Sequence, residues 1–495
     1  MTISQLPATS TSPTTQSPSP SPPLPAAAPE MTISSPTAPP ETPLATALEI
    51  PNPPSPHFVI FPFMSQGHTI PLLYFSRILS DRGLSVTIIT TPANYSAVRA
   101  AVKNDSISVV DLPFPEDALG VPPRIEVDDK ASAMASFINF VDATEKLQPG
   151  FEEIVRGLPP VNCIISDGFL SWTQDSADKL GIPRLVFYGT NIFAPTMCNI
   201  MMKFKPHATV GSDNDPFPVP GFPRLKLTVN DFEPPFSEVN PKGPLMDYIV
   251  KQQATFVKSH GMVVNSFYEL EPEFIDYWNQ HFEPKAWCVG PFCVAKPAVP
   301  KQMVEKPTWI EWLDKKVIEK KSVVYVSFGT QAEVSVEQLL EVADGLEKSN
   351  VGFMWTLKPK QFELIGGAGF EERVKGRGKV VTEWVDQVES ICAGVPVLAM
   401  PFMAEQHLNA RMVVEEIGIG LRLWAREKVA RGLVGAEEVA EKVVELMEGC
   451  GGRRVKERVM EVKEGAYGAM KEGGSSWVKL DSLIDHVCGN VVPRA

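Results

Sequence analysis

The sequence has no apolar run long enough to cross a membrane, and no basic segment followed by an apolar stretch near its first residue. A membrane-spanning helix needs about 20 predominantly apolar residues, and a secretory signal needs a basic and an apolar segment in that order. Neither feature is therefore predicted, and we expect a soluble, cytoplasmic protein.

Cysteine and histidine are scarce, with 7 of each, and no two cysteines form a C-x-x-C pair. An odd number of scattered cysteines argues against a disulfide framework and against a zinc site. The sequence also has no G-x-x-x-x-G-K-[ST] loop, and residues 418–420 lack the third glycine of a dinucleotide-binding fingerprint. We expect neither a metal nor a bound cofactor, and kinase and dehydrogenase activities are disfavoured.

Basic residues are fewer than acidic ones, 46 Lys and Arg against 59 Asp and Glu, which gives a formal net charge of −13. Nucleic acids and anionic membranes are bound through basic patches, so neither is an expected partner. The 495 residues are enough for two domains with full cores. The expectation is a two-domain enzyme that acts on small molecules.

Lysine and arginine are missing altogether from residues 1–56, which contain 16 prolines and many Ser, Thr and Ala. Such a segment cannot bury enough apolar surface to offset the entropy lost on ordering, so we predict a disordered tail. A plastid transit peptide is the alternative, although transit peptides carry arginine. The tetrapeptide Met-Thr-Ile-Ser at 1–4 recurs at 31–34, and we draw no function from this repeat.

From His57 onward, short apolar runs alternate with amphipathic segments. Residues 58–63 are predicted to be a buried strand and 64–68 the turn that leaves it, followed by a helix with Pro71 in its first turn and its stop at Gly83. Apolar strands separated by helices are typical of a parallel, helix-covered sheet, so residues 57–295 are predicted to form a doubly wound first domain. Its further strands are predicted at 85–91, 162–167, 184–188 and 261–265.

Residues 296–307 are rich in Pro and Lys and are predicted to be an exposed linker. A second alternating series follows, so residues 308–475 are predicted to form a second doubly wound domain. Its strands are predicted at 322–329, 351–356, 378–384 and 396–401, and amphipathic helices at 436–447 and 477–487.

Polar residues follow several predicted strands, at the edge where doubly wound sheets bind ligands. From the pattern alone, His68 either reaches a ligand cleft or is a packing histidine. Asp167 is a functional carboxylate or the cap of the following helix. Thr330 lies after another predicted strand. Two interpretations of this position remain, a phosphate-binding turn and a plain strand-to-helix turn.

Several motifs between Trp384 and Gln406 stand in a fixed order. They resemble the two ends of the signature box of plant family 1 UDP-glycosyltransferases. The H-C-G-W-N-S centre of that box is missing, because Gln387 is followed directly by Val388, and only 23 residues run from Trp384 to Gln406. The matching residues are Trp384 and Gln387 for W-x-x-Q, Glu389, Ser390, Gly394, Val395 and Pro396 for E-S-x-x-x-G-V-P, and Glu405 and Gln406 for the end of P-x-x-x-[DE]-Q.

The resemblance covers roughly residues 57–490 and implies a GT-B architecture, in which two Rossmann-like domains face each other across a cleft. It implies that a helix at 476–490 crosses back onto the first domain. His68 would be the general base, and Asp167 the carboxylate that hydrogen-bonds it. The resemblance implies that the nucleotide of the donor is held by Thr330 at the diphosphate, Trp384 on the uracil, Gln387 at the uracil or ribose, and Glu389 at the ribose hydroxyls. The sugar hydroxyls would be contacted by Glu405 and Gln406. Thr190 stands where many relatives have a threonine near the sugar.

The implied function is transfer of glucose from UDP-glucose to a hydroxyl of a small lipophilic plant metabolite, of the phenolic or flavonoid type, with inversion at the anomeric carbon. UDP-sugar is a co-substrate here, no metal is implied, and we expect a monomer. Because the box centre is missing, two alternatives stay open. One is a catalytically impaired relative that cannot hold UDP-sugar. The other is a mis-spliced or gene-model product, which transcript sequencing across the Gln387–Val388 junction would identify.

Overall fold

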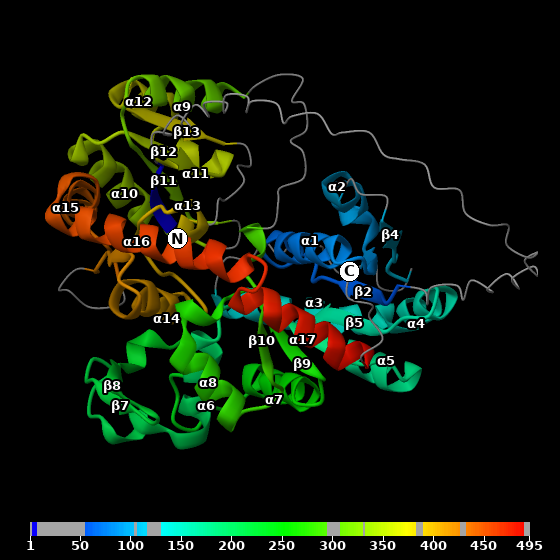
Figure 1. Cartoon of the computed structure of the whole chain (residues 1–495). Coiled ribbons are helices and arrows are strands. Elements are labelled where there is room, and N and C mark those ends of the chain that lie inside the picture. The colour runs from blue at the N-terminus through cyan, green and yellow to red at the C-terminus, as the bar shows by residue number, and fades with distance from the viewer. Residues whose placement is uncertain are drawn as a thin grey trace, which may run out of the picture. The chain divides into compact units, whose positions relative to one another are not determined.

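In a computed structural model, the strands of the described residues form two large sheets and one short hairpin (Figure 1). The structure describes residues 2–6, 55–102, 106–115, 130–294, 307–329, 332–382, 390–425 and 432–489.

The first sheet is parallel throughout, with its strands in the order β10-β9-β6-β5-β2-β3-β4. β2 and β5 are neighbours near its centre, so the turns that follow these two strands meet at one edge. This topology confirms the predicted doubly wound sheet. The strands are β2 (His57–Phe61), β3 (Ser85–Thr90), β4 (Ile107–Asp111), β5 (Cys163–Asp167), β6 (Arg184–Phe187), β9 (Gly261–Val264) and β10 (Ala286–Cys288).

Alternate residues of β2 enter different cores, which shows that both faces of this sheet are covered. Phe58 and Ile60 belong to one buried cluster, and Val59 and Phe61 to another. The helices of this half are α1 (Gln66–Asp81), α2 (Pro92–Val102), α3 (Lys130–Ala143), α4 (Gln148–Gly157), α5 (Thr173–Leu180), α6 (Phe193–Phe204), α7 (Pro244–Phe256) and α8 (Pro272–His281), with the hairpin β7 (Phe217–Val219) and β8 (Phe222–Leu227) between α6 and α7.

Helix α1 begins at Gln66, so the predictions of a turn at 64–68 and of Pro71 in the first turn of the helix are wrong. Ser65 is extended, with φ −128° and ψ 149°. Its carbonyl accepts hydrogen bonds from the amides of His68 (3.1 Å) and Thr69 (2.8 Å), which closes the first helical turn before the proline. His68 therefore lies in the first turn of a helix rather than in a loop.

The second sheet has the strand order β13-β12-β11-β1-β14-β15. β11, β12 and β13 are parallel to one another, as are β14 and β15, whereas β1 runs antiparallel to both of its neighbours. The strands are β1 (Thr2–Leu6), β11 (Val323–Ser327), β12 (Phe353–Thr356), β13 (Gly378–Val381), β14 (Val397–Ala399) and β15 (Gly420–Arg422).

The helices of this half are α9 (Thr308–Ile318), α10 (Val336–Ser349), α11 (Pro359–Leu364), α12 (Gly367–Arg373), α13 (Ser390–Ala393), α14 (Gln406–Arg411), α15 (Ala436–Glu448), α16 (Cys450–Met470) and α17 (Ser475–Cys488). α14 continues into a π-helical turn, Met412–Glu416. None of the helices in the described part of the chain combines the length and apolar character that a membrane crossing requires.

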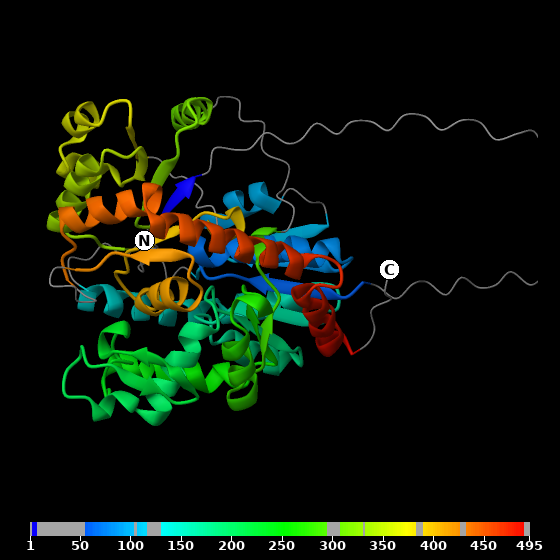
Figure 2. The ribbon, with the colours of Figure 1, turned by 60° about the vertical axis from the view of Figure 1, so that its left-hand side comes forward.

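The strand β1 corrects the prediction that residues 1–56 form a disordered tail, because Thr2–Leu6 are part of the second sheet (Figure 2). The physical reason is that β11 and β14 each need a hydrogen-bonding neighbour on the side where β1 lies. Residues 7–54 lie outside the described residues, as do residues 296–306 of the predicted linker.

Helix α17 packs with the first sheet. Leu480, Leu483 and Ile484 share a buried cluster with strand β2. The Ser476 hydroxyl donates to the carbonyl of Gly290 at 2.5 Å. This helix near the end of the chain is thus tied to segments that lie 186 positions or more earlier in the chain.

A buried carboxylate, Glu271, caps the start of α6. It accepts hydrogen bonds from the amide nitrogens of Ile192 (3.1 Å) and Phe193 (2.9 Å) and from the Ser266 hydroxyl. Burial raises the pKa of Glu271 from its ordinary 4.5 to about 7, although these hydrogen bonds act in the opposite direction. The folded protein therefore holds a proton on Glu271 over a pH range in which the unfolded chain has lost it.

We expect the free energy of unfolding to fall by up to about 3 kcal/mol from this group as the pH rises from about 4.5 to about 7, because the folded state binds the extra proton there. Glu271→Gln keeps an oxygen for the two amides and carries no charge, so it should remove this part of the pH dependence. Urea unfolding at pH 5, 6, 7 and 8 measures the difference. The exposed Glu273→Gln, two residues further on in the first turn of α8, is the control, and equal pH profiles for the two variants would contradict the assignment.

Candidate active site

His68 and Asp167 meet at the carboxyl edge of the first sheet. Asp167 is the last residue of β5, and His68 lies in the first turn of the helix that follows the neighbouring strand β2. His68 Nδ1 lies 2.6 Å from Asp167 Oδ2. Asp167 is fully buried, while 22% of the His68 side chain is exposed. The pair thus has a buried carboxylate behind an imidazole that solvent can still reach.

Asp167 is itself held in place by its neighbours. Its Oδ1 accepts a hydrogen bond from the Phe169 amide at 3.0 Å. The buried Arg184 guanidinium reaches the Asp167 carbonyl at 3.3 Å and the Ser166 hydroxyl at 2.7 Å. Burial lowers the pKa of Arg184 to about 10, so it stays charged at neutral pH. The end of β5 is therefore fixed by contacts on both the side chain and the main chain.

The pKa of His68 is raised above its ordinary 6.5. Burial lowers the pKa, but the charge of Asp167, its hydrogen bond to the ring and the charge of Glu405 raise it and outweigh burial. The arrangement stabilises the imidazolium form, as is required of a histidine that takes up a proton and then holds it.

Aromatic rings surround His68. The ring of Phe169 lies 5.1 Å from the imidazole, and that of Phe63 lies 5.7 Å from it. Phe137 contacts both phenylalanines, at 5.1 Å from Phe169 and 6.1 Å from Phe63. The exposed part of the imidazole is thus bordered by apolar surface.

Glu405 and Gln406 stand at the start of α14 in the second half of the chain. Glu405 is exposed, and its charge acts on the pKa of His68, which places it near the first-sheet site. Ala404 before it has φ 53°, a left-handed conformation that a residue with a Cβ rarely adopts. The Gln406 side chain accepts a hydrogen bond from the Phe402 amide at 2.9 Å, so its oxygen closes this turn.

Thr190 follows strand β6, at the same edge of the first sheet as Asp167. Its hydroxyl oxygen is buried, and no hydrogen-bond partner for it exists among the described residues. A buried hydroxyl without a partner is costly, and a bound molecule with a donor or acceptor would supply one.

The other predicted donor residues, Thr330, Trp384, Gln387 and Glu389, lie outside the described residues. Directly before Thr330 lies Gly329, which is described. Its φ of +75° is a conformation that favours glycine, and it turns the backbone after the end of β11.

Two polar contacts that sequence reasoning missed tie α14 to the first half of the chain. Arg411 donates from Nε to Asp231 Oδ1 at 3.0 Å, and the Asn191 amide donates to Asn409 Oδ1 at 2.8 Å. Asp231 is fully buried and also accepts from the amide and hydroxyl of Thr228, at 2.8 and 3.0 Å. No sequence signal pairs these residues, because they are 180 and 218 positions apart.

We expect Asp231→Asn to lower the free energy of unfolding by about 3–5 kcal/mol, since it removes the buried negative charge opposite Arg411 and leaves one acceptor oxygen where the carboxylate has two, one for Arg411 and one for Thr228. Chemical unfolding measures this loss. The control is Glu415→Gln, which removes the exposed second partner of the same Arg411 at 2.6 Å and should cost about 1 kcal/mol or less. Equal losses in the two variants would show that the buried contact is unimportant.

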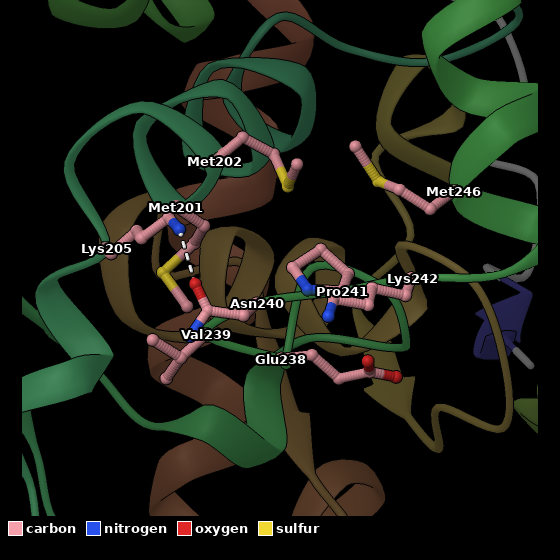
Figure 3. A pocket seen from close by; sticks show the side chains of 9 residues that line it. All are labelled: Met201, Met202, Lys205, Glu238, Val239, Asn240, Pro241, Lys242 and Met246. Atoms are coloured by element: carbon pink, nitrogen blue, oxygen red, sulfur yellow. Dashed lines mark hydrogen bonds between the residues drawn. The ribbon is translucent and has the colours of Figure 1, made fainter.

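A separate cavity of about 340 Å³ lies between the end of α6, residues 238–242 and the start of α7 (Figure 3). Met202 and Met246 extend toward each other across it, and Lys205 donates to Asn240 on its wall at 2.9 Å. Neither His68 nor Asp167 lines this cavity.

Within the described ranges, no group of three His, Cys, Asp or Glu side chains could hold a metal ion.

Three named plant proteins are similar to the chain over nearly their whole length. UDP-glycosyltransferase 90A1 of Arabidopsis thaliana is 43% identical over 463 residues, 87% of this chain and 96% of that protein. UDP-glucose flavonoid 3-O-glucosyltransferase 7 of Fragaria ananassa is 33% identical over 470 residues, 86% and 95% of the two chains. Scopoletin glucosyltransferase of Nicotiana tabacum is 32% identical over 470 residues, 87% and 98%. No model of a protein family matches the chain.

Solved structures resemble the fold. Glycyrrhiza uralensis UGT73P12, complexed with glycyrrhetinic acid 3-O-monoglucuronide, has a TM-score of 0.75 and 27% identity, and the match covers 88% of this chain and 96% of that one. Phytolacca americana UGT2, complexed with UDP-2fluoro-glucose and pterostilbene, has a TM-score of 0.70 and 25% identity, with coverage of 88% and 100%. These likenesses confirm the predicted GT-B architecture.

Proposed function

The chain belongs to the plant UDP-glycosyltransferases, and we propose that it transfers glucose from UDP-glucose to a hydroxyl of a small phenolic metabolite. The names of two relatives, one for a flavonoid and one for scopoletin, support this acceptor class. The observation that carries the proposal is the 2.6 Å contact between His68 and Asp167 at the ligand-binding edge of the first sheet.

In the proposed reaction, His68 donates its Nδ1 proton to Asp167 in a hydrogen bond, which leaves the Nε2 lone pair free to act as a base. Nε2 takes the proton of the acceptor hydroxyl while that oxygen attacks the anomeric carbon. The new C–O bond forms as the bond to the UDP oxygen breaks, and UDP leaves with the electron pair. A single displacement of this kind inverts the anomeric configuration, and no enzyme nucleophile or second carboxylate takes part.

The raised pKa of His68 supports the base role, because the imidazolium formed in the reaction is stabilised by the Asp167 charge. The phenylalanines beside the imidazole, Phe63 and Phe169, would form the apolar wall against which a phenolic acceptor lies.

For the donor, we propose that Glu405 and Gln406 contact the sugar hydroxyls and that the Thr190 hydroxyl gains a partner there. Carboxylate, amide and hydroxyl groups suit vicinal diols because each offers hydrogen-bonding atoms at close spacing. The proposal assigns the rest of UDP-glucose to Thr330 at the diphosphate, Trp384 on the uracil, Gln387 at the uracil or ribose, and Glu389 at the ribose hydroxyls.

The second candidate is a catalytically impaired relative. It is favoured by the short span of 23 residues from Trp384 to Gln406, in which the centre of the signature box is missing.

The test is incubation with UDP-glucose and a flavonol, scopoletin or pterostilbene, with products identified by mass spectrometry and anomeric configuration by NMR. A β-glucoside from this chain supports transfer with inversion. An α-glucoside contradicts the mechanism. Product only from a form with a family-like segment inserted between Gln387 and Val388 supports the impaired relative.

A further inference from the structure

The first residues of the chain occupy a central position in the second sheet. β1 lies between β11 and β14, with Thr2 opposite both Ser327 and Ala399 and Ile3 opposite both Val326 and Leu398. Both contacts are antiparallel, although every other pairing in this sheet is parallel. The dark-blue arrow of β1 in Figure 1 lies beside β11.

The strands on either side of β1 have no other strand as a hydrogen-bonding neighbour on this side. Neighbouring strands lie about 4.8 Å apart, so β11 and β14 are two strand spacings from each other and cannot bond directly. All five residues of β11 and all three of β14 are buried. With β1 in place these strands are covered, so their amide and carbonyl groups on this side find their partners in β1, and loss of β1 would remove those hydrogen bonds.

We propose that the space between β11 and β14 is a strand-accepting site, and that its occupant is the chain's own N-terminal segment, Thr2–Leu6. An extended peptide of the same sequence should bind there when that segment is removed. The site recognises its occupant mainly through backbone hydrogen bonds, which also give the affinity when a peptide adds to the edge of a sheet. Here the occupant bonds to two strands at once.

The composition of the tail explains why this segment is the occupant. Residues 2–6 contain no proline, whereas the tail up to residue 56 contains 16, and proline cannot donate to a strand ladder. The repeat at 31–34 matches the first copy only as far as Ser34, and Pro36 stands where the first copy has Leu6. Leu6 is paired with Val323 in the ladder, so the second copy is the poorer strand. The 48 residues from 7 to 54 leave ample chain to reach back to Ser55.

The test in the full chain compares Ile3→Pro with Ile33→Pro, which places the same substitution in the same tetrapeptide. Hydrogen–deuterium exchange is followed at the amides of β11 and β14, with β2 and β5 of the first sheet as an internal reference. Ile3→Pro should speed exchange in β11 and β14 by about fivefold or more, the effect of losing at least one backbone hydrogen bond. Ile33→Pro should change none of the four strands. Unchanged exchange in Ile3→Pro, or a larger effect from Ile33→Pro, overturns the proposal.

A second measurement uses a protein without residues 1–8 and a fluorescent peptide of residues 1–8. Saturable binding of the peptide, together with return of slow exchange in β11 and β14, supports the site, and the Ile3→Pro peptide should not bind. If the shortened protein precipitates, recovery of soluble protein on refolding with either peptide makes the same comparison. Equal results with the two peptides overturn the proposal.

Discussion

Replacing His68 by alanine should lower the rate of glucosyl transfer by about a hundredfold or more, which is the usual contribution of a positioned general base. The measurement requires a form that binds the donor, so the variant is made in the chain with a family-like segment inserted between Gln387 and Val388. The affinity for UDP should stay the same, because the imidazole would act on the acceptor hydroxyl and not on the nucleotide. A loss of UDP binding in His68→Ala would refute the base assignment.

Asp167→Asn should act in the same direction as His68→Ala but more mildly, and it should also change the pH profile. The rate should fall at acid pH as Nε2 becomes protonated, with an inflection above 6.5 because the pKa of His68 is raised. Without the Asp167 charge this inflection should move to lower pH. His260→Ala is a suitable control, since His260 is exposed and precedes β9, at the opposite edge of the same parallel sheet.

The placement of His68 and Asp167 at one edge of the first sheet could be predicted from local patterns and one general rule, whereas their pairing was implied only by the resemblance to the family. Continuous apolar runs mark parallel strands, and the ends of such strands gather at one edge. Residues 58–61 and 163–165 are runs of this kind, and the strands there are adjacent. The sequence did not predict that α1 begins at Gln66, because Pro71 is a strong start signal. The Ser65 carbonyl overrides it with two hydrogen bonds to amides before the proline.

The contacts that join distant segments could not be predicted. Asp231 and Arg411 carry no pattern that would pair them, and their contact depends on how two separate helical turns are placed. The strand at Thr2–Leu6 is harder still, because its composition is that of a short polar segment inside a proline-rich tail. Only the unsatisfied edges of β11 and β14 give it a structure, and those edges are formed by residues more than three hundred positions away.

The chain as it stands should bind UDP weakly, with a dissociation constant far above the micromolar range. In a parallel sheet each strand delivers a turn and a helix start to the carboxyl edge, and amides there bind phosphate. β1 is antiparallel, so its own carboxyl end, Leu6, lies beside Val323 at the opposite edge. It completes the hydrogen bonding of the sheet but supplies no turn where a diphosphate would lie. Of the helix before β14, α13, the described residues are four, Ser390–Ala393.

Calorimetric titration of UDP measures this weakness directly, and a micromolar dissociation constant, about −8 kcal/mol, would show that the remaining residues rebuild the donor site. A family-like segment between Gln387 and Val388 should tighten binding by about a hundredfold or more if the phosphate-binding turn is what the chain lacks. A Gly/Ser segment of equal length at the same junction is the control, and it should leave the affinity unchanged. The inserted strand would take the place of β1 between β11 and β14, so Ile3→Pro should lose its effect on exchange in the restored form. If Ile3→Pro still speeds exchange there while UDP binds tightly, the inserted segment binds phosphate without entering the sheet.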